Sequence, residues 1–184
     1  AFQRSGAEGI SGNGRVVVGN SSTPSGTTHA VQWTGKGAAQ DLNGGNFIAS
    51  FAQRASRDGG TIIGYGSTAT RTNEAFVWTA GTGMTGLGVL ASQAGDTGAV
   101  SRATDVSADG TITVGYSAAT SGRAEAFRWT NSGGMVSLGL LSGGNDSRAF
   151  AISSDGTTIV GSANRPSAFV AGIQDTVAFR WTQS

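Results

Sequence analysis

Two acidic side chains, Glu8 and Asp105, are the strongest candidates for catalytic chemistry in this sequence. They come shortly after Ala7 and Ala103, which open equivalent copies of a short repeated segment. If these segments form the innermost strands of a ring of sheets, both carboxylates would face its centre, where a carboxylate pair could catalyse glycoside hydrolysis. The competing interpretation, which we favour, is that both are solvated residues on a strand or at its rim. The sequence therefore predicts no catalytic residue and no enzyme activity.

The single histidine, His29, is the other residue that could act as a general base or a metal ligand. The other copies of the repeat hold Glu74, Glu125 and Val177 at the same position, so we interpret His29 as a residue on the face of a strand. A serine triad would need this histidine as its base, and no nucleophile elbow accompanies it.

Four Asn-Gly or Asp-Gly pairs raise the question of calcium binding, and they begin at Asn13, Asp58, Asp109 and Asp155. Calcium takes six or more oxygen ligands, whereas each of these turns offers one or two. The chain has no cysteine, which excludes thiolate metal sites and disulfides. The sequence predicts no metal and no cofactor.

The elements that carry these residues repeat four times along the chain. Each copy contains a strand with one tryptophan, and the four are Trp33, Trp78, Trp129 and Trp181. They are 45, 51 and 52 residues apart, a period typical of propellers, solenoids and arrays. The Asn-Gly and Asp-Gly pairs are hairpin signals, since both residue types tolerate positive φ, and each precedes a β-branched strand that ends in Val-Gly or Ile-Gly.

These patterns predict an all-β chain that forms a four-bladed β-propeller from four repeats of about 46 residues. The single domain 1–184 would divide into blades at approximately 1–46, 47–97, 98–144 and 145–184. A β-solenoid is the alternative fold, although its coils usually stack parallel strands, whereas these turns indicate antiparallel hairpins.

The tryptophan strand places large and small residues on opposite faces. Tryptophan and the residue two positions earlier share one face, and the alanine beside it lies on the other. Neighbouring blades could then pack large against small without voids. The predicted core of the repeat consists of the four tryptophans together with Phe76, Phe127 and Phe179.

The combination of A-x-x-I/V-S-x-D/N-G, a Val-Gly strand, H/E-A-F-x-W-T and G-M-x-x-L-G-x-L resembles the HAF-repeat family of extracellular bacterial proteins. The eponymous position reads His29-Ala30-Val31 in the first copy and Glu74-Ala75-Phe76 in the second. The resemblance covers almost the whole chain, although histidine occurs only in the first copy and the Met-Leu-Gly strand is missing from the fourth. It implies secretion or surface exposure and a repeat fold, and it implies no defined activity.

Composition and charge narrow the function classes further. The formal net charge is +1, Lys36 is the only lysine, and no run of positive charge indicates nucleic acid as a partner. No apolar stretch has the length of a membrane span. The sequence begins Ala1-Phe2, a start that signal-peptide removal would leave. We therefore predict a secreted protein of the bacterial cell surface or matrix.

The fourth copy stops after its tryptophan strand, without the strand that follows in the other copies. The edge formed by Ala178, Phe179, Arg180 and Trp181 would then be unpaired, and an unpaired edge is a template for another chain. Our leading hypothesis is self-association, in which the N-terminal segment (Ala1, Phe2, Gln3 and Arg4) or an edge strand of a neighbour completes this blade and builds an extracellular filament or matrix. Closure by the chain's own residues 1–6 is left open. The alternative function is a lectin-like, glycan-binding propeller, with its site in variable loops such as 164–175.

Overall fold

The computed structural model describes residues 4–90, 98–119, 122–170 and 172–183. Within these ranges the chain consists of strands, turns and loops, and no helix has the length and apolar character that a membrane crossing needs. The strands form four antiparallel sheets, each built from strands that are consecutive in the sequence. The prediction of an all-β chain with antiparallel sheets is therefore confirmed.

The first two sheets each have four strands, in the order in which the chain forms them. Sheet 1 consists of β1 (Ser5–Ile10), β2 (Val16–Ser22), β3 (Thr28–Thr34) and β4 (Gln40–Asp41). Sheet 2 consists of β5 (Phe47–Ala55), β6 (Thr61–Thr68), β7 (Glu74–Thr79) and β8 (Gly83–Gly86). With two residues, β4 is shorter than β8.

The last two sheets differ in their number of strands. Sheet 3 consists of β9 (Ser101–Val106), β10 (Ile112–Ala118), β11 (Ala124–Thr130) and β12 (Gly134–Ser137). Sheet 4 consists of β13 (Ser147–Ile152), β14 (Thr158–Pro166) and β15 (Gln174–Thr182). In the described part of the chain, the outer edge of β15 has no paired strand.

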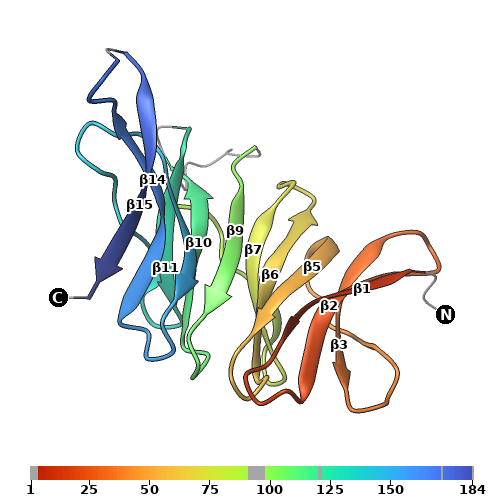
Figure 1. The fold of residues 1–184 in the computed structure, drawn as a ribbon. Helices are drawn as coiled ribbons and strands as arrows, with labels where there is room; N and C mark the ends of the chain where they lie inside the picture. Colours follow the sequence, from red (N-terminus) through yellow and green to blue (C-terminus); the bar gives the residue numbers. More distant parts are fainter. Residues whose placement is uncertain (1–3, 91–97, 120–121, 171, 184) are drawn as a thin grey trace.

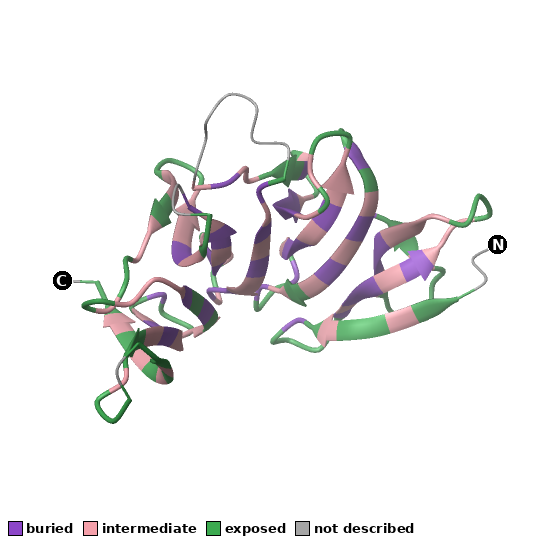
Figure 2. Cartoon of the chain, turned by 90° about the horizontal axis from the view of Figure 1, so that it is seen from above, coloured by how far each residue is buried: buried purple, intermediate pink, exposed green. Residues whose placement is uncertain are grey.

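The four sheets follow one another in a curved row, with sheet 1 at one end and sheet 4 at the other (Figure 1). The view from above shows the same open arc, with buried residues concentrated where consecutive sheets meet (Figure 2). The first strands of neighbouring sheets contact one another along the inner side, β1 with β5, β5 with β9, and β9 with β13. The core is therefore divided into three layers, one at each junction between sheets.

The turn between the first two strands of each sheet is built differently from the sequence expectation. Only the glycine has positive φ, as at Gly59 (81°) and Gly110 (75°), and no described non-glycine residue does. In sheet 2, the amide of Gly59 donates to the carbonyl of Ser56, which closes a four-residue turn within a five-residue loop. The aspartate keeps its ordinary conformation and is used as a hydrogen-bond acceptor instead.

A close approach between strands explains the glycine that ends each Val-Gly or Ile-Gly pair. At Gly115 in β10, an added Cβ would lie 1.9 Å from the carbonyl oxygen of Arg102 in β9. The register between these strands shifts at this point, which brings the two backbones together. Glycine is required because no side chain fits there.

Candidate functional site at the open ends of the sheet stack

Consecutive sheets pack a face of small residues against a face of large ones. The small face of each sheet includes a β-branched residue and an alanine, such as Val114 and Ala126 of sheet 3. The large face of the next sheet supplies the tryptophan strand and an aliphatic neighbour, here Ile159 with Phe179 and Trp181 of sheet 4. The same pairing joins sheet 1 to sheet 2 and sheet 2 to sheet 3.

A buried serine joins each sheet to the one before it. These inter-sheet serines are Ser50, Ser101 and Ser147, two residues before the first-strand alanine of sheets 2, 3 and 4. Each hydroxyl accepts from an alanine amide in the third strand of the preceding sheet: Ala30 N to Ser50 Oγ, Ala75 N to Ser101 Oγ and Ala126 N to Ser147 Oγ, all at 2.9 Å. These serines were not predicted from the sequence, although their repeated position, two residues before the alanine, is visible in it.

A chain of backbone hydrogen bonds also crosses the stack at the first turn of each sheet. The amide of Arg57 donates to the carbonyl of Ala108 at 3.0 Å, and the amide of Ala108 donates to the carbonyl of Ser154 at 3.1 Å. Between sheets 1 and 2 the donor is the amide of Asn13, which bonds the carbonyl of Arg57 at 2.9 Å. The donor always belongs to the earlier sheet and the acceptor to the later one.

At the C-terminal end of the stack, the small face of sheet 4 is uncovered. Val160 is 42% exposed, whereas Val18, Ile63 and Val114, which occupy the same position in the other sheets, are fully buried. Ala178 is likewise exposed, although its counterparts in sheets 1 to 3 are fully buried. Of the candidate assembly residues on β15, Ala178 and Arg180 lie on this open face, and Phe179 and Trp181 lie on the large face, packed against sheet 3.

At the N-terminal end, the β1 part of the large face of sheet 1 is uncovered, although Val31 on the same face is fully buried. Ser5 and Ala7 of β1 are exposed, whereas the inter-sheet serines and the corresponding alanines are buried. Arg4 extends β1, since its carbonyl accepts from the amide of Ser22 at 2.8 Å. Residues 4–10 therefore pair with sheet 1 and do not cross to β15, while Ala1, Phe2 and Gln3 lie outside the described residues.

The two carboxylates proposed as a catalytic pair are held in different sheets. Glu8 is an exposed residue of β1, and its backbone carbonyl accepts from Nη1 of Arg54 at 3.2 Å. Asp105 lies in β9, and its Oδ2 accepts from the amide of Ile152 at 2.9 Å, which ties sheet 3 to sheet 4. Because β5 lies between β1 and β9, the structure does not bring the two carboxylates together.

His29 forms part of a contact between the third and fourth strands of its sheet. Its Nδ1 lies 2.8 Å from Oδ2 of Asp41 in β4. In sheet 2, Oε1 of Glu74 accepts from the amide of Gly88 at 3.1 Å, and in sheet 3, Oε2 of Glu125 accepts from the hydroxyl of Ser137 at 2.6 Å. Sheet 4 lacks a fourth strand in the described chain and has the apolar Val177 at this position. In sheets 1 to 3, the polar residue at this position therefore bonds the fourth strand or the residue that closely follows it.

The turn carboxylates are occupied by hydrogen bonds from their own turns. Oδ1 of Asp109 accepts from the hydroxyl of Ser107 at 2.5 Å and from the amide of Thr111 at 3.0 Å. These bonds hold the pKa of Asp109 below its usual value, and the equivalent bonds from Ser153 and Thr157 lower the pKa of Asp155 to about 2. The described residues contain no group of three or more His, Asp or Glu that could hold a metal ion.

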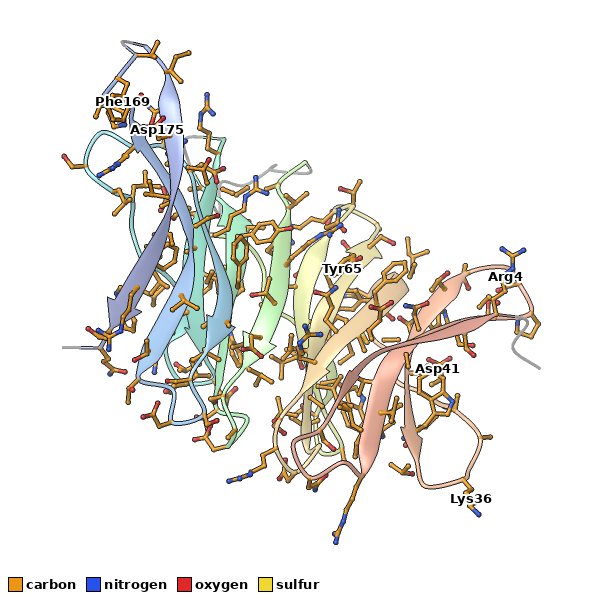
Figure 3. All side chains as sticks on the ribbon, in the orientation of Figure 1. Arg4, Lys36, Asp41, Tyr65, Phe169 and Asp175 are labelled. Carbon is orange, nitrogen blue, oxygen red and sulfur yellow. The ribbon has the colours of Figure 1, made fainter. Side chains whose placement is uncertain are left out.

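A groove of about 670 Å³ lies between sheets 2 and 3. Its walls combine the aromatic ring of Trp129 with hydroxyls from both sheets, including Thr79, Thr85 and Thr111, and with Asp109. The variable loop near 164–175 is different in character, since it forms the tip of the long β14–β15 hairpin. Figure 3 shows Phe169 at this tip, and its side chain is 94% exposed.

No protein-family model matches the sequence, and no curated protein matches it. Several solved structures resemble its fold. TolB from Acinetobacter baumannii superposes with a TM-score of 0.58 at 15% identity, over 89% of this chain and 40% of that one. A TolB-type protein from Agrobacterium tumefaciens superposes with a TM-score of 0.63 at 14% identity, over 98% of this chain and 67% of that one. Hydrazine synthase from Kuenenia stuttgartiensis superposes with a TM-score of 0.52 at 10% identity, over 98% of this chain and 51% of that one.

The likeness is one of fold alone. The sheets are arranged like those of TolB-like β-propellers. The chain spans two fifths of the A. baumannii protein and two thirds of the A. tumefaciens one.

Proposed function

We propose that this chain is a non-catalytic structural protein that assembles outside the cell, with its four sheets serving as propeller blades. The observation that carries the proposal is the outer edge of β15, which lies where β12 pairs in sheet 3. A strand from a neighbouring chain would complete this fourth blade, either an N-terminal segment or an edge strand. Repetition of the contact would build a filament or matrix.

The edge of β15 has the properties of a strand acceptor. Its outward-facing backbone groups include those of Ala178 and Arg180, and the only charged side chain near its end is Arg180. Natural proteins usually protect such an edge with proline, several charges or a cover. The extracellular location rests on the resemblance to HAF-repeat proteins, whose position outside the cell fits a role in a surface or matrix.

The test is the oligomeric state of a chain whose β15 edge is blocked. Arg180→Pro removes an outward-facing backbone donor within the part of β15 that a fourth strand would cover, and proline is tolerated at sheet edges. Thr176→Pro is the matched control, because it removes an outward donor from the same strand beyond that part. Light scattering should show multimers for the wild type and the control and reduced multimers for Arg180→Pro. Equal masses for all three would contradict edge completion.

A second candidate function is glycan binding in the groove between sheets 2 and 3. It is favoured by the half-buried ring of Trp129 beside threonine hydroxyls, since sugars stack on aromatic faces and hydrogen-bond to such groups. Glycan-array binding that disappears with Trp129→Leu would favour this function, provided that the variant stays folded. The absence of any bound glycan would count against it.

A further inference from the structure

We propose that the open small face of sheet 4 binds the open large face of sheet 1 in a second copy of this chain. The two copies would join head to tail through the same contacts that join consecutive sheets within one chain. The inference rests on the proposed assembly function and specifies its interface, which extends over the broad face of sheet 4 as well as its edge.

A hydrogen-bond donor on sheet 4 and an acceptor on sheet 1 occupy matching repeat positions. Ala178 pairs with Ser162 as Ala126 pairs with Tyr116, so the amide of Ala178 faces the outer side of its sheet, as the amide of Ala126 does. The amide of Ala126 bonds an inter-sheet serine, whereas no described residue supplies that hydroxyl to Ala178. Ser5 occupies the serine position in sheet 1 and is exposed, and its hydroxyl has no hydrogen-bond partner among the described residues.

The chain of backbone hydrogen bonds at the first turns of the sheets also has an open donor at one end and an open acceptor at the other. This chain ends at Ser154, whose carbonyl accepts from Ala108 and whose amide has no partner among the described residues. At the other end of the stack, the carbonyl of Gly12 occupies the matching acceptor position and is likewise unpaired in the described chain. The amide of Ser154 can therefore bond the carbonyl of Gly12 in a second copy, as the amide of Ala108 bonds the carbonyl of Ser154.

The small face of sheet 4 and the large face of sheet 1 also have matching side chains. At the junction of sheets 3 and 4, the small face meets Ile159 and Trp181. Sheet 1 presents Val17 and Trp33 at the same two positions, and both are partly exposed. A β-branched aliphatic residue and a tryptophan would thus cover Val160, just as they cover its fully buried counterparts elsewhere. Burial of this apolar surface supplies the driving force for association.

A second copy is the partner that these observations specify, because this chain carries both halves of the contact. The donors and the small face lie on sheet 4, and the acceptors and the large face lie on sheet 1. These sheets stand at opposite ends of the arc, so the two faces do not meet within the described residues (Figures 1 and 2). A contact between two different surfaces is heterologous, and it produces either a closed ring or an open filament.

The test uses one substitution at each end of the stack and then mixes the two variants. Ala7→Asp places a charge on the large face of sheet 1, and Val160→Asp places one on the small face of sheet 4. Val136→Asp and Ala80→Asp are the matched controls, because both positions are exposed and lie away from either face. Melting temperatures should show that all four variants are folded, and sedimentation velocity then gives their masses.

We expect multimers from the wild type and both controls, and monomers of 18.4 kDa from each interface variant alone. A mixture of Ala7→Asp with Val160→Asp retains one intact interface per pair, so it should form a dimer and stop there. Multimers that survive both substitutions would overturn this interface and leave assembly through the β15 edge standing. A wild type that stays monomeric at millimolar concentration would overturn the interface and the proposed function together.

Discussion

Replacement of an inter-sheet serine provides a direct measure of how strongly the sheets are joined. Ser101 is fully buried, and its Oγ accepts from the amide of Ala75 at 2.9 Å and donates to the carbonyl of Gly88 at 2.6 Å. Ser101→Ala leaves both backbone groups without this partner at a buried junction. An unsatisfied buried polar group costs about 1–3 kcal/mol, so we expect the free energy of unfolding to fall by about 3 kcal/mol.

The matched control is Ser5→Ala, the same change at the same repeat position on the open face of sheet 1. Ser5 is exposed and has no partner within the described chain, so its replacement should change the free energy of unfolding by less than about 0.5 kcal/mol. The assay is urea unfolding of the dilute monomer, followed by tryptophan fluorescence. If the two variants lose similar stability, the inter-sheet serines do not join the sheets in the way described.

Three further predictions concern positions within single sheets or at their junctions. Gly115→Ala should lower the free energy of unfolding in urea by about 3 kcal/mol, because the added Cβ would overlap the carbonyl of Arg102, whereas Gly81→Ala, in open space, should change it little. Tyr65→Leu should cost about 1 kcal/mol in the same assay, since the guanidinium of Arg102 lies 4.0 Å from the Tyr65 ring centroid. Asp109→Asn should destabilise the protein slightly at pH 7. Because folding lowers the pKa of Asp109 from its usual value of 3.8, that difference should begin to shrink near pH 4 and disappear only below the lowered pKa of the folded protein, as thermal melts across pH would show.

The sequence was sufficient to predict the repeated architecture because its signals are local. Trp129 and Ala126 fall on opposite faces of β11 by strand alternation, and the glycine of each Asp-Gly turn does adopt positive φ.

The features that the sequence did not reveal depend on how sheets meet. Ser101 resembles any exposed strand serine until the neighbouring sheet places the amide of Ala75 beside it. His29 was a candidate for catalysis, but its role as a partner of Asp41 emerges only from the pairing of β3 with β4.

The most direct measurement is hydrogen exchange at the amide of Ala178 as a function of protein concentration. In a head-to-tail assembly this amide bonds Ser5 of a second copy, so its protection should rise from near zero in dilute solution towards that of Ala126 as the concentration increases. The amide of Ala126, which is bonded within the chain, serves as the internal reference and should stay protected throughout. An Ala178 amide that exchanges rapidly at every concentration would contradict the account.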